Sequence, residues 1–198
     1  MRLIVDWDGT VTVRDSQWML LERFGDRELF AATEDALGTT LSYREVMERQ
    51  LATVRVPLEE AVAFLVDEVE VRAGFAALAE RFAPLVLSSG FVETIEPILA
   101  REHVTVDVVG NRLDPRPEGW RVIWNDEAPC PECGDLCKRR ALPKEHPLVY
   151  VGDGFSDRCA ALAADRVFAR RALAEYLDAE GVPYETFETF DEVAAALT

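Results

Sequence analysis

The chain has 198 residues, a length typical of one domain or of one domain with a modest insert. Its composition, 49% hydrophobic and 29% charged, excludes a wholly disordered chain and a low-complexity fibre. With 37 acidic and 21 basic side chains, the formal net charge is −16. No segment gathers enough Lys and Arg to bind nucleic acid or an anionic membrane surface, so we expect neither partner. An anionic substrate would therefore need a strongly positive local pocket, which a metal ion would help to provide.

Nothing in the sequence resembles a targeting or membrane segment. The N-terminus leads directly into a strand-like run at residues 3–5, and no apolar run approaches the length of a membrane span. Three of the four cysteines lie within residues 130–137, which is not the spacing of a secreted disulfide framework. We therefore expect a soluble cytoplasmic protein that acts as a monomer or a homodimer.

Short apolar runs that end in a polar residue recur along the chain. Residues 3–5, 84–87 and 148–151 are such runs, and they are typical of buried parallel strands. A turn containing glycine follows each of them. The remaining predicted elements are helix 92–101, helix 156–164, strand 166–169, helix 172–179, strand 184–187 and helix 191–197. This alternation predicts an α/β fold, with a doubly wound, mostly parallel sheet in a Rossmann-like core.

Residues 13–73 break this alternation, because they contain no convincing buried strand. They predict four amphipathic helices, at about residues 15–24, 27–37, 42–54 and 57–68. Ser42 and Glu45 have the spacing of a capping box at the start of the third helix. We expect a small helical cap domain at residues 13–73, inserted after the first strand into a catalytic core made of residues 1–12 and 74–198.

The least regular region is residues 104–147, which several prolines interrupt. A strand at 104–109 and a hairpin arm at 119–124 are predicted there. Trp120 and Trp124 have the spacing that places both rings on one face of that arm, which indicates packing.

Two carboxylates follow the first predicted strand, in the sequence Asp6-Trp7-Asp8-Gly9-Thr10. Ligands bind at the carboxyl ends of strands in open α/β sheets. Carboxylates in this position can hold Mg²⁺, and one of them can attack a phosphorus centre while the other transfers protons. Taken alone, the pattern fits a strand that ends in a polar turn equally well.

Two other strand ends carry complementary groups. Residues 152–157, with the sequence Gly-Asp-Gly-Phe-Ser-Asp, supply two more acids, although Ser156 could simply cap a helix. Residues 88–91, with the sequence Ser-Ser-Gly-Phe, offer hydroxyls and backbone N–H groups at a helix start, which suit a phosphate. Three strand ends with such groups favour phosphate chemistry over three unrelated turns.

These motifs, with a lysine before the last of them, resemble the four ordered motifs of the haloacid dehalogenase superfamily, in particular its phosphatases. The helical cap after the first strand and residues 71–75 are similar to the phosphoserine-phosphatase-like branch. Within that branch, Cys137-Lys138 with two cysteines upstream, together with residues 152–161, look most like the 2-hydroxy-3-keto-5-methylthiopentenyl-1-phosphate phosphatases. The chain departs from the pattern at Trp7, where Phe is more usual.

The resemblance implies a role for each acid of the first motif. Asp6 would be the nucleophile that forms a phosphoaspartyl intermediate, and Asp8 would protonate the leaving oxygen and then activate water. A lysine would neutralise the charge on the transferring phosphoryl group. The chain has only two lysines: Lys138 starts a helix-like stretch, whereas Lys144 lies in a turn-like stretch, so we choose Lys138.

The resemblance also implies the ligand sets. Mg²⁺ would be bound at four acids, namely Asp6, Asp8 (through its backbone carbonyl), Asp153 and Asp157. Asp157 would act through water or by holding neighbouring groups. The phosphoryl group would be bound by Ser88, Ser89 and Gly90. Ser89 stands where Gly is more usual, which could narrow the phosphate pocket.

The cysteines allow two interpretations. Cys130, Cys133 and Cys137 could be three ligands of a zinc ion, with Cys159 or His146 as the fourth. A closed zinc site normally shows a second clear pair of ligands, and the sequence does not show one. We favour instead small, partly buried residues that shape the loop before the chosen lysine, or a reversible disulfide between the first two cysteines.

The sequence thus predicts a Mg²⁺-dependent enzyme that hydrolyses a small-molecule phosphomonoester, with 2-hydroxy-3-keto-5-methylthiopentenyl-1-phosphate as the first candidate. Phosphoserine, phosphocholine or phosphoethanolamine, and pyridoxal phosphate are the alternative substrates. A phosphate-ligand or metal-binding module without turnover would require a missing catalytic residue, and none is missing. A phosphotransferase that uses an acceptor other than water is a further alternative.

Overall fold

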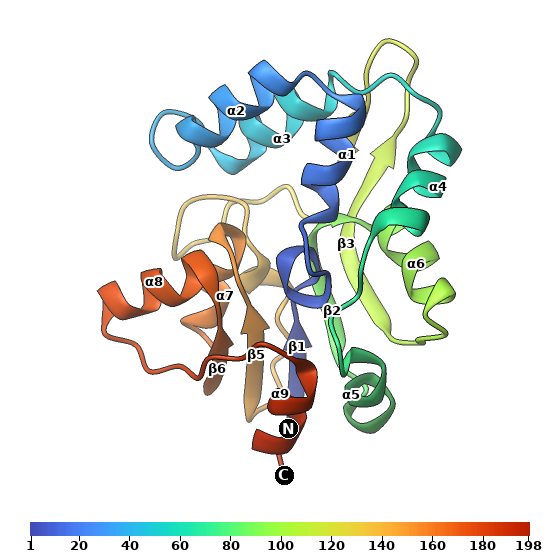
Figure 1. Cartoon of the computed structure of the whole chain (residues 1–198). Helices are drawn as coiled ribbons and strands as arrows, with labels where there is room; N and C mark the ends of the chain where they lie inside the picture. Colours follow the sequence, from blue (N-terminus) through green and yellow to red (C-terminus); the bar gives the residue numbers. More distant parts are fainter.

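Six strands form one sheet in the spatial order β4-β3-β2-β1-β5-β6 (Figure 1). The structure is a computed structural model that describes residues 1–198. The strands are β1 (Arg2–Val5), β2 (Leu85–Phe91), β3 (Asp107–Asp114), β4 (Arg121–Ile123), β5 (Leu148–Gly152) and β6 (Arg166–Ala169). Neighbouring strands are parallel except for β3 and β4, which are antiparallel. The predicted α/β fold with a doubly wound, mostly parallel sheet is confirmed.

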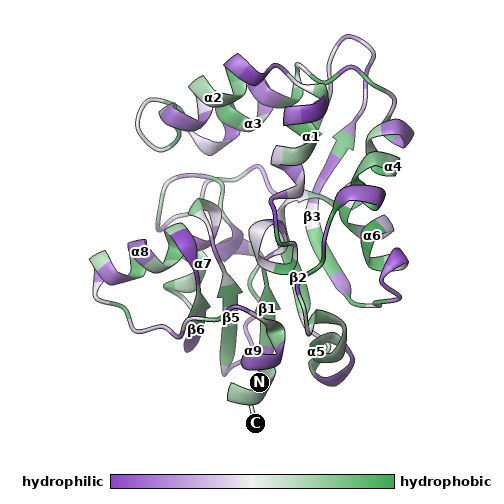
Figure 2. Ribbon diagram, in the orientation of Figure 1, coloured by the Kyte–Doolittle hydropathy of each residue, from purple (hydrophilic) through white to green (hydrophobic).

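Successive residues of the central strands face opposite sides of the sheet. Leu3 and Val5 of β1 belong to one apolar core, whereas Ile4 belongs to another. Both faces therefore need a cover of helices, and the strands are among the most hydrophobic segments in Figure 2. The first face packs on α5 (Phe75–Phe82), α6 (Val92–Arg101) and α9 (Phe190–Ala196), and the second on α7 (Arg158–Ala161) and α8 (Arg171–Glu180).

Four helices lie between β1 and α5, as predicted. They are α1 (Ser16–Phe24), α2 (Arg27–Ala36), α3 (Tyr43–Leu51) and α4 (Leu58–Glu68). Side chains cap the first three at their N-termini, and the predicted capping box of Ser42 and Glu45 is present on α3. Helices α1–α3 lie beyond the carboxyl ends of β1 and β5 (Figure 1). No helix of the structure is both long enough and apolar enough to cross a membrane.

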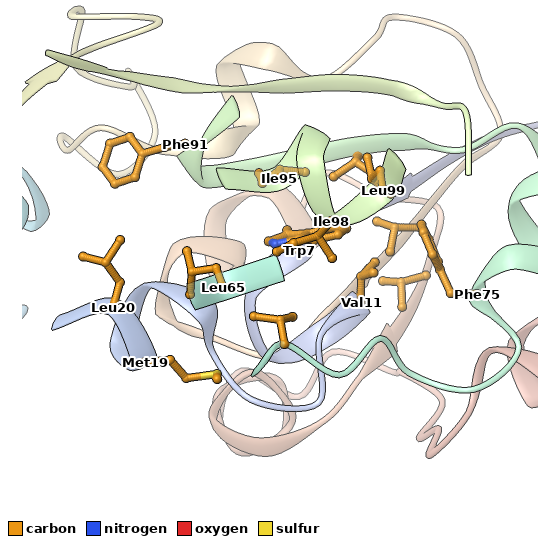
Figure 3. Close-up of a cluster of buried hydrophobic side chains, with 14 of the residues drawn as sticks. Trp7, Val11, Met19, Leu20, Leu65, Phe75, Phe91, Ile95, Ile98 and Leu99 are labelled. Carbon is orange, nitrogen blue, oxygen red and sulfur yellow. The ribbon is translucent and has the colours of Figure 1, made fainter. Parts of the chain in front are cut away.

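The apolar core on the first face of the sheet continues into the helical segment. Trp7, fully buried after β1, shares this core with Ile98 of α6 and Leu65 of α4 (Figure 3). Leu20 of α1 belongs to the same cluster. The helical segment is thus packed on the sheet through shared side chains, and the division into a cap at 13–73 and a core of 1–12 and 74–198 stays a prediction.

Some predicted elements differ from the structure in extent. The strand predicted at 104–109 begins only at Asp107, because Val104 and Val106 pack from a coil against the core. The strand predicted at 184–187 forms a single bridge, from Glu185 to Phe168, because the chain turns there to bury Phe187. The helix predicted at 156–164 is a short 3₁₀ turn, η3 (Phe155–Asp157), followed by the one-turn α7, and α5 was not predicted.

Candidate active site

The carboxyl ends of three adjacent parallel strands bring the predicted site residues together. Asp6 follows β1, Asp153 follows β5, and Ser88 lies in β2, two residues beyond the last pairing of that strand with β1. The carboxylates of Asp6, Asp153 and Asp157 offer oxygens that all lie within 4.8 Å of one another. All of these side chains are buried, so the site is a concentration of negative charge in a region of low dielectric constant.

Lys138 supplies the positive charge at the centre of this group. It begins a 3₁₀ helix, η2 (Lys138–Ala141), and its ammonium group donates to Asp6 Oδ1 and, at 2.6 Å, to Asp157 Oδ1. Burial alone would lower the pKa of Lys138, but the carboxylates of Asp157 and Asp6 outweigh burial and raise it. The lysine is therefore charged at neutral pH. Lys144, the alternative, is exposed on a loop.

Asp157 is fully engaged by protein groups. Its Oδ1 accepts from Lys138 and from the Tyr150 hydroxyl at 2.7 Å, and its Oδ2 accepts from the backbone N–H groups of Asp153 and Gly154, each at 2.9 Å. Four donors occupy the acceptor positions of a carboxylate. This geometry favours the second of the two predicted roles, in which Asp157 holds its neighbours.

The pKa values of the other acids are raised by burial. Burial raises the pKa of Asp6 well above its ordinary value, and Asp157 raises it further. Burial, followed by Asp157, raises the pKa of Asp153 to about 6. For Asp8, burial outweighs the hydrogen bonds from Ser16, which include its N–H at 2.8 Å, and the pKa is raised. A raised pKa suits Asp8 to donate a proton near neutral pH.

The oxygens of Asp6 and Asp153 fit a hard divalent cation. Asp6 Oδ2 has no partner in the protein, and the two contacts to Asp153, from Thr10 and Arg171, are both long at 3.4 Å. Carboxylate oxygens are the ligands that Mg²⁺ prefers. The acid cluster can therefore bind such an ion without breaking a short hydrogen bond.

A buried arginine holds the turn between the two catalytic-motif acids and the first helix. Arg72 donates to the backbone carbonyls of Thr10 at 2.8 Å, Gly9 at 3.0 Å and Thr12 at 3.2 Å. Gly9 has a φ of +73°, and a Cβ there would lie 2.2 Å from Asp153 Oδ2. Only glycine therefore lets this turn approach the acid cluster.

The end of β2 forms the predicted phosphate-binding segment, with one difference. The N–H of Gly90 donates to Ser88 Oγ at 2.8 Å and is therefore not free for a ligand. That bond leaves the Ser88 hydroxyl proton available. The Ser89 carbonyl accepts from the Asn111 side chain at 2.8 Å, and a Cβ at position 90 would lie 2.9 Å from Asp8 Oδ2.

A cavity of about 290 Å³ lies between these strand ends and the helical segment. The helical segment contributes apolar side chains, among them Trp18, Val46 and Met47, and polar ones, among them Glu34 and Gln50. Sequence reasoning did not assign any of these residues to the site. Their positions depend on how α1–α3 pack, which no local motif encodes.

Arg171 is a further residue that sequence reasoning missed. It follows β6 and lines the cavity, where its guanidinium lies 3.4 Å from Asp153 Oδ2 and 3.3 Å from the carbonyl of Val13. The sequence feature that could have identified Arg171 is its position two residues after the predicted strand 166–169, at the edge of the sheet where the other site residues lie. The positive charge of Arg171 offsets part of the negative charge of the acid cluster, beside the phosphate-binding segment.

Comparison with known proteins identifies the family. Residues 3–162 match the haloacid dehalogenase-like hydrolases. A 2-hydroxy-3-keto-5-methylthiopentenyl-1-phosphate phosphatase of Brevibacillus brevis is 31% identical, over 98% of this chain and 94% of its own. A polyol phosphate phosphatase of Saccharomyces cerevisiae is 28% identical, over 98% and 91%. A substrate-bound phosphoserine phosphatase has the same fold, with a TM-score of 0.72, 16% identity and coverage of 98% and 97%.

The fold and the acid–lysine site define a hydrolase built on an open α/β sheet. The chain belongs to the haloacid dehalogenase-like hydrolases. It is a phosphatase of this family.

Replacing the buried lysine should slow the reaction strongly. We expect Lys138→Ala to lower kcat by roughly 10²–10³, the cost of losing one donor to a transition state. Lys144→Ala, at the exposed lysine, is the matched control and should keep the wild-type rate. The measurement is hydrolysis of p-nitrophenyl phosphate at saturating Mg²⁺, with circular dichroism to verify folding. A larger loss in Lys144→Ala than in Lys138→Ala would place the catalytic lysine elsewhere.

The buried Asp153 should make the metal-free protein less stable as pH rises. Its pKa is raised to about 6, so between pH 4 and 6 the native state keeps a proton that the unfolded state releases. The free energy of unfolding should fall by on the order of 3 kcal/mol between pH 4 and 7, and Asp153→Asn should remove that part of the fall. Urea unfolding with EDTA present measures both proteins, and identical pH dependence would contradict the argument.

Proposed function

We propose that this chain hydrolyses the phosphomonoester of a small metabolite, with Asp6 as the nucleophile, Asp8 as the acid and base, and Mg²⁺ as the cofactor. The observation that supports this proposal best is the position of Lys138, whose ammonium group bridges Asp157 and Asp6, and Asp6 lines the cavity. Burial raises the pKa of Asp6, and the charge of Lys138 opposes that rise because it favours the ionised carboxylate that attacks phosphorus. Lys138 also lies where a phosphoryl group bound to Asp6 would need a positive charge.

In the first half of the reaction, an oxygen of Asp6 attacks the phosphorus of the ester. An acyl phosphate bond forms on Asp6, the bond from phosphorus to the alcohol oxygen breaks, and the leaving oxygen takes the proton of Asp8. The Ser88 hydroxyl and Lys138 bind the equatorial oxygens of the phosphoryl group and stabilise their charge.

In the second half, the ionised Asp8 takes a proton from water. That water attacks the phosphorus, the acyl phosphate bond breaks, and Asp6 and inorganic phosphate are released. The Ser16 N–H and hydroxyl both hold Asp8 Oδ1, so the carboxylate keeps one orientation while it gives and regains its proton. The helical segment over the site limits the entry of other water.

Mg²⁺ would be held by the carboxylates of Asp6 and Asp153 and by the backbone carbonyl of Asp8. It would supply the positive charge that lets a phosphate dianion approach this group of acids. Asp157, with four donors already in place, would orient Lys138 and the turn at Asp153.

Hydrolysis is favoured over ligand binding without turnover because each group that the two half-reactions require is present. A phosphotransferase would share the first half-reaction. It would differ only in the second, where an alcohol rather than water would take the phosphoryl group from Asp6. Analysis of the products with and without an added alcohol distinguishes these cases, and we expect inorganic phosphate in both.

The cavity supports a small substrate with both a polar and an apolar part. Val46 and Met47 of α3 are buried beside it, and they would suit a methylthio group. These contacts support 2-hydroxy-3-keto-5-methylthiopentenyl-1-phosphate, the substrate in the name of the Brevibacillus relative, as the first candidate.

A polyol phosphate is the second candidate, and a different part of the cavity supports it. Gln50 donates to Glu34 at 2.8 Å, and both side chains line the cavity away from the strand ends. Such a pair offers acceptors and donors to a chain of hydroxyl groups. A polyol phosphate phosphatase is also among the relatives that cover nearly the whole chain.

Loss of the nucleophile should abolish turnover without unfolding the protein. We expect Asp6→Asn to show no hydrolysis, because an amide cannot form the acyl phosphate. Asp8→Asn should lose turnover but accumulate phosphoenzyme with a good leaving group, which acid-quench mass spectrometry would detect. Wild-type activity should disappear with EDTA and return with Mg²⁺. Normal turnover by folded Asp6→Asn would refute the assignment.

Comparison of substrates tests the identity of the metabolite. We expect kcat/KM to be highest for the methylthiopentenyl phosphate, with a polyol phosphate next. Phosphoserine, phosphocholine, phosphoethanolamine and pyridoxal phosphate complete the panel. A clear preference for phosphoserine would contradict the narrow assignment. Efficient hydrolysis of a phosphoprotein would contradict the role of the helical segment as a cover.

A further inference from the structure

All four cysteines of the chain meet at one place, outside the acid cluster. The sulfurs of Cys130, Cys133, Cys137 and Cys159 lie within 4.8 Å of one another, and none forms a disulfide. The first three come from the loop that leads into η2, and the fourth comes from α7. His146, the other ligand considered from the sequence, lies elsewhere and pairs with Asp165 at 2.6 Å.

We propose that these four cysteines bind one zinc ion as a tetrathiolate site. A tetrahedral site with Zn–S bonds of about 2.3 Å has sulfurs about 3.8 Å apart. The sulfurs of Cys130 and Cys159 are 3.8 Å apart, well beyond the bond of about 2.05 Å that a disulfide requires. Because all four sulfurs lie within 4.8 Å of one another, one ion can reach all of them with small side-chain movements.

The backbone around the first two cysteines has the tight turn that such a pair needs. The N–H of Gly134 donates to the carbonyl of Cys130 at 2.8 Å, and the N–H of Cys130 donates to the carbonyl of Asp135 at 2.9 Å. Gly134 has a φ of +76°, which glycine adopts without strain. This turn brings Cys133 back beside Cys130, so the two sulfurs form one side of the site.

Burial and charge also suit a zinc tetrathiolate. Cys130 and Cys159 are buried, whereas Cys133 is exposed and leaves a path for the ion to enter. Four thiolates around Zn²⁺ carry a net charge of −2, which needs cations nearby. Arg139, Arg140 and Glu132 line the surface depression that contains Cys130, and because Arg140 pairs with Asp126, Arg139 is the cation that can offset part of that charge.

The position of this site links it to catalysis. Cys137 directly precedes Lys138, and Cys159 lies two residues after Asp157. A zinc ion would therefore join the loop that carries the catalytic lysine to the helix that follows its carboxylate partner. The ion would act as a positioning element for the Lys138–Asp157 pair, separate from the oxygen-ligand site proposed for Mg²⁺.

Metal analysis of the untagged protein, purified without chelators, tests the site directly. We expect one zinc per chain by plasma mass spectrometry, and cobalt substitution should give the strong visible bands of a tetrahedral thiolate site. Cys133→Ser, at the exposed ligand, should lower the zinc content and the affinity for cobalt. Glu132→Gln, at the neighbouring residue, is the matched control and should keep both.

Two results would refute zinc binding, and both come from the wild-type chain, so a misfolded variant does not weaken the test. One is a protein that contains no zinc and binds no cobalt. The other is an intact mass and thiol count that show a disulfide in place of the metal. Neither measurement depends on phosphatase activity, so failure of this proposal is distinguishable from failure of the proposed function.

A kinetic comparison tests the positioning role. With Mg²⁺ saturating, Cys133→Ser should lower kcat by roughly tenfold to a hundredfold, the loss expected from a misplaced catalytic group. In the Lys138→Ala background the same substitution should have little further effect, because the group it positions is already absent. Equal losses in both backgrounds would show that the cysteines act on folding rather than through Lys138.

Discussion

The structure depends on one interaction, the burial of the Lys138 ammonium group between Asp6 and Asp157. Several carboxylates converge at the carboxyl edge of the sheet, and without a cation they would repel one another in a medium where water cannot screen them. The lysine relieves that repulsion and determines which oxygens stay free. The acceptor positions of Asp157 are all occupied by four donors, whereas Asp6 and Asp153 keep oxygens available for substrate and metal.

The rest of the fold brings these charges together and keeps water out. Parallel strands bring acids from distant parts of the chain to one edge, and Arg72 holds the turn that follows Asp8 through three backbone carbonyls. The helical segment shares its apolar core with the sheet, so the lid over the site is anchored through Leu65 and its neighbours. Side chains of this lid line the cavity opposite the catalytic acids, so they are the groups that the non-reacting part of a substrate would contact.

The proposed zinc site would hold in place the loop that carries the lysine. This loop has little regular structure, with one 3₁₀ turn between β4 and β5. A lysine that must stay within hydrogen-bond distance of two buried carboxylates needs a firmer support than a loop usually gives. Four cysteines provide such a support, because a metal cross-link joins the loop to α7 in the folded state.

Local periodicity and short motifs were enough to predict the central parallel strands, the four helices after β1 and the acids at the strand ends. The sequence also separated Lys138 from Lys144, since only the former precedes a helix-like stretch. Tertiary structure alone decided that Asp157 is saturated, that Arg171 reaches Asp153, and that Cys159 rather than His146 joins the other cysteines. These facts depend on contacts between residues distant in sequence, and periodicity carries no information about such contacts.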